Sequence, residues 1–167
     1  AMLWFLMGYT SKLAGTETGV TEPVSTFSRF FGAPFMPRQP EVYAKLLGEM
    51  MEKHNASVYL VNTGWSGGPY GEGSRMDITL TRSIVEAALN GDLEGVKYTY
   101  DPLFQVNVPN ECPNVPGDVL TPKNTWKDKA AYDARAKKLA SDFAAKFDSA
   151  YEGHGIDPAV AAQCPGK

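Results

Sequence analysis

Apolar residues recur at helical spacing in two long stretches of the chain. The first begins at Pro40, a residue suited to the first turn of a helix, where its missing N–H does no harm. It runs to about Lys53, and we expect Asn55 to end it. Its apolar stripe comprises Val42, Tyr43, Leu46, Leu47 and Met50. The second stretch begins near Asn124, a common N-cap residue. Its stripe, which we interpret as core and not as a cofactor site, comprises Tyr132, Ala136, Leu139, Phe143 and Phe147.

Short runs of β-branched and aromatic residues predict strands elsewhere. Residues 58–61 (VYLV) form such a run and are expected to be a buried strand. Residues 96–100 and 103–108 alternate on either side of the turn at Asp101 and Pro102, which predicts a hairpin. Residues 26–31 are expected to form a strand or a tight turn.

The chain opens on an apolar block, residues 2–7 (MLWFLM). We expect a helix from Met2 to about Leu13 that belongs inside a core, because its first part is apolar nearly all round. The block lacks the basic leader of a signal peptide and is far shorter than the roughly 20 apolar residues of a membrane span. It suggests a chain cut from something larger, and without its partners the block would drive self-association.

A glycine-rich loop separates the predicted strand at 58–61 from a helical run at 82–89. Its backbone is too free to hold a helix or a strand. Open α/β folds bind ligands in such strand–loop–helix arrangements, beyond the carboxyl end of the strand. A simple surface turn is an equal alternative for a lone glycine loop. The loop contains Gly64, Gly67, Gly68, Pro69, Gly71 and Gly73.

Composition and charge narrow the function classes. With 167 residues and 43% hydrophobic content, the chain can bury one core, so we expect a single unit, 1–167, with a loosely ordered tail at 153–167. One short helical turn is expected at 158–162. The net charge of −3 does not indicate the basic surface that a nucleic-acid-binding protein needs.

Few residues suggest catalytic or metal chemistry. Cys112 and Cys164 lack CxxC spacing and nearby histidines, so we expect no metal site, a passive Cys112 and a reduced, cytoplasmic setting. His54 is interpreted as a surface histidine favoured by the helix dipole and not as a base. The charges of the last helix alternate in sign, which is typical of a solvated face. No GxxxxGKS or GxxxxGKT, HExxH or GxSxG motif occurs, so no catalytic residue is expected.

Three separated segments resemble one enzyme family. They are YTSKLAGTETGVTEP at 9–23, FFGAPF at 30–35 and YLVNTGWSGGPYGEGSRMDITLTR at 59–82. In this order they resemble the carboxyl-terminal part of the ATP-dependent phosphoenolpyruvate carboxykinases. The resemblance continues through 102–109 and 122–125. It implies an α/β fold, the distal portion of the mononucleotide-binding C-terminal domain of that family, with few strands and about four helices.

The resemblance also implies a function for the parent enzyme. The family are gluconeogenic lyases that convert oxaloacetate and ATP to phosphoenolpyruvate, ADP and carbon dioxide with Mg²⁺ and Mn²⁺. Their P-loop, metal ligands and substrate-binding arginines lie upstream of this chain, so no catalytic or metal-binding residue is carried over. The chain alone is therefore expected to be inactive, and neither nucleic acid nor a membrane is an expected partner.

Three residues can be carried over from the family's adenine and ribose site: Arg75, Met76 and Thr81. The planar guanidinium of Arg75 can stack on adenine or reach the ribose, and Met76 offers an apolar wall. Thr81 can cap the following helix and donate a hydrogen bond. Met76 stands where the family pattern leads us to expect isoleucine, but volume and apolarity are kept. A non-catalytic nucleotide- or peptide-binding module and a purely structural subdomain are the alternatives.

Overall fold

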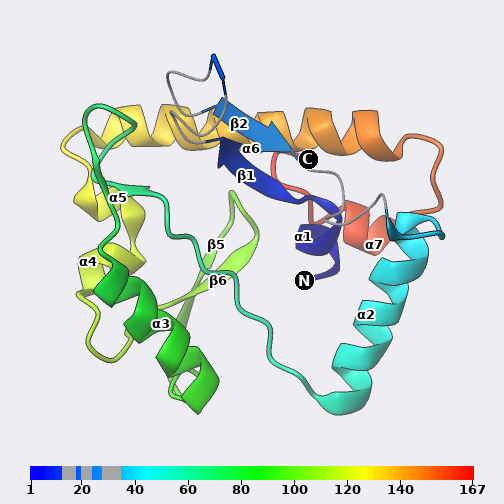
Figure 1. Ribbon diagram of the computed structural model, residues 1–167, viewed down its shortest axis with the longest axis horizontal. Helices are drawn as coiled ribbons and strands as arrows, with labels where there is room; N and C mark the ends of the chain where they lie inside the picture. The colour runs from blue at the N-terminus through cyan, green and yellow to red at the C-terminus, as the bar shows by residue number, and fades with distance from the viewer. Residues whose placement is uncertain (13–17, 20–23, 28–34) are drawn as a thin grey trace. The chain divides into compact units, whose positions relative to one another are not determined.

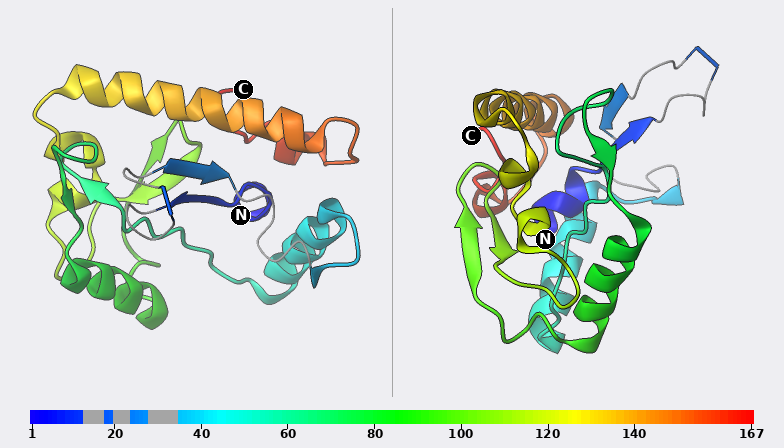
Figure 2. Two further views of the ribbon diagram at one scale, coloured as in Figure 1. Left: turned by 45° about the horizontal axis from the view of Figure 1, so that its top comes forward. Right: turned by 90° about the vertical axis from the view of Figure 1, so that its left-hand side faces the viewer.

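The computed structural model describes residues 1–12, 18–19, 24–27 and 35–167 (Figure 1). Its internal contacts divide the chain into two compact units. Unit 1 comprises residues 1–58 and 139–167, and unit 2 comprises residues 59–138. The long helix α6 (Lys129–Tyr151), yellow to orange in Figure 2, contributes residues to both units.

The described elements are short apart from three helices. Unit 1 contains α1 (Met2–Leu6), β1 (Tyr9–Lys12), β2 (Val24–Phe27), α2 (Pro40–His54) and α7 (Pro158–Ala161). Unit 2 contains β3 (Trp65–Ser66), β4 (Ser74–Arg75), α3 (Ile78–Asn90), β5 (Tyr98–Asp101), β6 (Val106–Pro109), α4 (Gly117–Leu120) and α5 (Pro122–Thr125). The mixture of helices and small two-stranded sheets is consistent with the α/β fragment that we expected. We expected about four helices, and the described residues form seven. The difference arises from short helices of four or five residues, which are α1, α4, α5 and α7.

The N-terminal helix is shorter than predicted. It ends at Leu6, and β1 begins at Tyr9 and pairs antiparallel with β2. Gly8 disfavours continuation of the helix. The residues that follow, Tyr9 to Lys12, instead pair with β2 as a strand. Residues 28–31 of the predicted strand or turn at 26–31 lie outside the described residues.

Aromatic contacts with Phe143 organise the core of unit 1. Trp4 meets the Phe143 ring edge-on at 5.2 Å, and Phe27 does so at 5.1 Å. The Tyr151 hydroxyl donates a 2.7 Å hydrogen bond to the carbonyl of Leu6. Leu3, Leu6 and Met7 are buried, as predicted for this block. The block thus finds partners inside unit 1, and self-association through it stays a prediction.

The core stripe predicted on the last helix is confirmed at its main positions. Ala136, Phe143 and Phe147 are buried. The predicted turn near Pro158 is also confirmed, as α7, whose N-cap Asp157 accepts a 2.8 Å hydrogen bond from the Ala159 N–H. Cys164, beyond α7, is fully buried.

Helix α2 begins and ends as predicted, with Pro40 in its first turn and Asn55 in the left-handed conformation at φ 48°. It contacts α1 through its small residues. A Cβ on Gly48 would lie 2.6 Å from the Met2 sulfur, so the glycine permits this approach. The large residues of its stripe, Val42, Leu46 and Met50, remain exposed.

The predicted buried strand at 58–61 is wrong for this chain. These residues are extended, and Leu60 is 58% exposed. No backbone–backbone hydrogen bond joins residues 57–63 to any described residue. A strand requires a neighbour to satisfy its backbone, and none of the described residues supplies one.

The hairpin predicted after α3 is confirmed as β5 and β6, with Thr99 opposite Val108. Asp101 stabilises its turn, because its Oδ1 accepts hydrogen bonds from the N–H groups of Leu103 and Phe104 at 2.8 and 3.0 Å. The small core of unit 2 comprises Ala87, Leu93 and Cys112, with Tyr59, Ile84, Ala88, Val115 and Leu120 packed against it. The burial of Cys112 agrees with its interpretation as a passive hydrophobe. No helix in the described ranges is long and apolar enough to cross a membrane.

Candidate nucleotide-binding loop

The glycine loop is a closed hairpin. Strands β3 and β4 pair antiparallel, with Trp65 opposite Arg75 and Ser66 opposite Ser74. The Met76 N–H extends the pairing by donating a 3.0 Å hydrogen bond to the carbonyl of Gly64. The loop is therefore held at its base on both sides.

Two glycines allow the sides of the loop to touch backbone against backbone. A Cβ on Gly68 would lie 2.9 Å from the Gly73 nitrogen. A Cβ on Gly73 would clash with the carbonyl oxygens of Gly68 and Ser66. At the tip, the Pro69 carbonyl accepts hydrogen bonds from the N–H groups of Glu72 and Gly73 at 3.1 and 2.8 Å. The loop conformation is thus fixed by its backbone and requires glycine at both positions.

A side chain from α5 also holds the loop. The Gly67 N–H donates a 3.0 Å hydrogen bond to the Thr125 hydroxyl oxygen. The Thr125 hydroxyl in turn donates a 2.7 Å hydrogen bond to the Pro122 carbonyl. This fixed threonine was not found from the sequence, since contacts between distant positions leave no local pattern.

The three predicted nucleotide-binding residues fall at the junction between this hairpin and α3. Arg75 is the last residue of β4 and is exposed. Met76 follows it and is half-buried. Thr81 lies in the first turn of α3, half-buried, with its hydroxyl 3.5 Å from the Asp77 carbonyl oxygen. An exposed guanidinium beside a thioether and a weakly bonded hydroxyl could hold a planar base and a sugar.

Asp77, and not Thr81, caps α3. Its Oδ1 accepts hydrogen bonds from the Thr79 hydroxyl at 2.6 Å and from the Thr79 N–H at 2.7 Å. These bonds favour the carboxylate and hold the pKa of Asp77 below its ordinary value. Helix α3 therefore begins at Ile78, four residues before the predicted start. An aspartate before the apolar run was a sequence signal for this cap.

The described residues contain neither a cluster of metal ligands nor a thiol with a lowered pKa. In the ranges that the structure covers, no three His, Cys, Asp or Glu side chains lie together so that they could hold a metal ion. The described residues therefore do not form a site for the Mg²⁺ or Mn²⁺ that the resemblance implies. Burial raises the pKa of Cys164 to about 11, which keeps the thiol protonated near neutral pH. His54 is exposed, as expected of a surface histidine.

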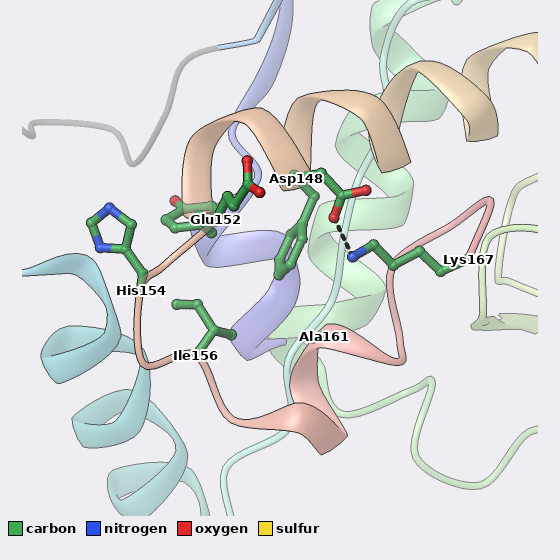
Figure 3. A pocket seen from close by; sticks show the side chains of 8 residues that line it. Asp148, Glu152, His154, Ile156, Ala161 and Lys167 are labelled. Carbon is green, nitrogen blue, oxygen red and sulfur yellow. Dashed lines mark hydrogen bonds and ion pairs between the residues drawn. The ribbon is translucent and has the colours of Figure 1, made fainter.

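Unit 1 contains a separate pocket of about 380 Å³ (Figure 3). It lies beside the end of α6, where Lys167 pairs with Asp148 and its ammonium lies 4.7 Å from the centre of the Phe147 ring. The pocket includes none of Arg75, Met76 and Thr81. Its lining comprises Phe147, Asp148, Tyr151, Glu152, His154, Ile156, Ala161 and Lys167.

Comparison with known proteins decides the family. The family model for phosphoenolpyruvate carboxykinase matches residues 1–118, which include the whole glycine hairpin and α3. The chain belongs to this family. The resemblance drawn from the three sequence segments is thereby confirmed.

Curated relatives carry the same family name. The chain is 63% identical over 147 residues to phosphoenolpyruvate carboxykinase (ATP) 1 of Moorella thermoacetica, covering 88% of this chain and 28% of the relative. It is 59% identical, with the same coverage, to the enzyme of Caldanaerobacter subterraneus. It is 54% identical over 160 residues to that of Geobacillus thermodenitrificans, covering 96% of this chain and 30% of the relative. The chain thus spans less than a third of the length of these relatives.

Proposed function

We propose that this chain is the carboxyl-terminal part of an ATP-dependent phosphoenolpyruvate carboxykinase and contributes the adenine and ribose side of its ATP site. The observation that carries the proposal is the family match across the glycine hairpin. The hairpin sets Arg75, Met76 and Thr81 at one junction between β4 and α3. The domain to which they belong is then the distal portion of a mononucleotide-binding domain.

Each residue has a distinct role in this proposal. The Arg75 guanidinium stacks on the adenine face or binds the ribose, because it is exposed and forms no ion pair with a described residue. The Met76 thioether provides an apolar wall, and its backbone is held by Gly64. The Thr81 hydroxyl is free to turn to a ribose oxygen, since its 3.5 Å contact with Asp77 is at the limit of a hydrogen bond.

The contribution of these residues to the reaction is to bind and orient the nucleotide. The parent enzyme would transfer the γ-phosphoryl group of ATP during conversion of oxaloacetate to phosphoenolpyruvate, carbon dioxide and ADP, a cytoplasmic step of gluconeogenesis. That transfer depends on cationic groups and metal ions at the γ-phosphate. The predicted site residues of this chain lie at the other end of the nucleotide. We therefore expect the 167-residue chain alone to form no phosphoenolpyruvate in a coupled assay with metal.

The experiment that tests the site is calorimetric titration of the full-length polypeptide with ATP. Arg75→Ala should weaken ATP binding about 5- to 30-fold, equivalent to about 1 to 2 kcal/mol for a partly desolvated cation–π contact. Thr81→Val should weaken it less, and should leave thermal stability without nucleotide unchanged because Asp77 supplies the helix cap. Lys97→Ala, an exposed cation elsewhere in unit 2, is the matched control. ATP affinity that is unchanged in Arg75→Ala would remove this residue from the site.

A further inference from the structure

Helix α3 has apolar residues on two faces. Its inner face carries Ile84, Ala87 and Ala88, which pack with Leu93 and Cys112 in the core of unit 2. Its outer face carries Ile78, Val85 and Leu89. Their spacing of seven and four residues places them in one line along the helix. A helix that is apolar on both faces is normally buried on both.

The outer face is open to solvent in this chain. Ile78 is 60% exposed, Val85 40% and Leu89 82%. Single exposed apolar residues are ordinary, but a line of three on one helix face is typical of a contact surface. By contrast, the strip between the two faces is polar and contains Thr79, Glu86 and Asn90. The outer line is therefore separated from the inner face by these three polar residues on one side and by Thr81 alone on the other.

One charge lies within the outer stripe. Arg82 occupies the turn between Ile78 and Val85 on the same side of the helix. It is exposed and forms no ion pair with any residue that the structure describes. A surface that covers this face would need apolar side chains around an acidic group placed opposite the guanidinium, because a buried unpaired charge is costly.

We infer that the outer face of α3 docks against a segment of the same polypeptide that precedes this chain. The inference rests on the proposed function, which makes the chain the last part of a longer enzyme. The relatives carry more than two thirds of their length outside the region matched here. That length is ample to provide a covering segment, and the expected segment is apolar with one carboxylate facing Arg82.

Thermal unfolding of two lengths of protein tests the docking. In the full-length polypeptide, Leu89→Lys should lower the melting temperature by several degrees, because a charge would be buried at the contact. In the 167-residue chain the same change should leave it unaltered, since Leu89 is already in water. Asn90→Lys is the matched control: it adds the same charge at the next position, on the polar strip, and should be neutral at both lengths.

The results for Leu89→Lys and Arg75→Ala distinguish docking of an upstream segment from dimer formation, and they test the docking separately from the proposed nucleotide site. A full-length protein indifferent to Leu89→Lys would overturn the inference. If, in addition, the 167-residue chain formed dimers in light scattering that Leu89→Lys dissociated, the occupant would be a second copy. If Leu89→Lys destabilised the full-length protein while Arg75→Ala left its ATP affinity unchanged, the docking would stand and the proposed nucleotide site would fall.

Discussion

The Gly67 N–H donates a hydrogen bond to the side chain of Thr125, 58 positions later in the chain, at 3.0 Å. This bond ties the glycine loop to α5 within unit 2. Because the β3–β4 hairpin has only two residue pairs, this bond from outside adds to the few backbone hydrogen bonds that hold the loop. Position 125 can therefore affect a loop to which it is not adjacent in sequence.

We predict that Thr125→Val loosens the loop. It removes the acceptor for the Gly67 N–H with little change in shape, and should cost about 1 kcal/mol of unfolding free energy in urea titrations. Hydrogen exchange at the Gly67 amide should be faster. Thr121→Val is the control, because Thr121 is exposed and makes no side-chain capping bond. Equal exchange rates in Thr125→Val and the unsubstituted chain would show that the tether has no effect.

We predict that Gly73→Ala destabilises unit 2. Its methyl group would meet the Gly68 and Ser66 carbonyl oxygens, which belong to backbone and cannot move aside cheaply. Overpacking of this kind costs about 1–3 kcal/mol, measurable as a lower denaturant midpoint. Gly95→Ala should be close to neutral, since no atom lies within 4 Å of its added Cβ. A neutral Gly73→Ala would mean that the two sides of the loop are not in contact in solution.

We predict that the Asp77 cap makes stability depend on pH in the acid range. The pKa of Asp77 is lower in the folded protein than its ordinary value of 3.8. Its contribution is therefore present above about pH 4 and is lost as the pH falls through the folded value. Denaturant midpoints should differ between the unsubstituted chain and Asp77→Ala at pH 6 and converge towards pH 2. A difference that stays constant across this range would contradict a role for the ionised carboxyl.

We predict that Cys164 resists alkylation in the folded chain. Its side chain is fully buried, and burial raises its pKa to about 11, so little thiolate is present at pH 8. Labelling with iodoacetamide should follow unfolding, as read by mass spectrometry across a urea series. Because the folded pKa is the higher one, this thiol stabilises the fold below about pH 9, and its contribution is lost as the pH rises towards 11. Rapid labelling in native buffer would show that the C-terminal segment opens.

Local signals predicted local structure well. Pro40 and Asn55 bound α2 as expected, and the spacing of Phe143 and Phe147 predicted the buried face of α6. The start of α3 was misplaced because Thr81 was considered as the cap and Asp77 was not, although aspartate is at least as strong a cap. The local sequence contained enough information to place the start of this helix, and the wrong one of two nearby cap residues was chosen.

Contacts between residues that are far apart in the chain could not be predicted from the sequence. Residues 58–61 have the composition of a strand but find no partner among the described residues, and composition cannot supply one. The Thr125 tether and the backbone contact between Gly68 and Gly73 were likewise invisible. For the candidate site, Arg75, Met76 and Thr81 came from the family resemblance. Their junction between the hairpin and α3 is a feature of the structure.

The hydrogen bond from the Tyr151 hydroxyl to the Leu6 carbonyl has a consequence for the order in which the chain folds during translation. Unit 2 is one continuous run of residues, so all of it is synthesised before the last part of unit 1. Unit 1 must close a contact across 145 positions, and its N-terminal helix waits for the end of α6. Unit 2 should therefore complete its contacts before unit 1, because the bond between Leu6 and Tyr151 can form only once the end of α6 is available.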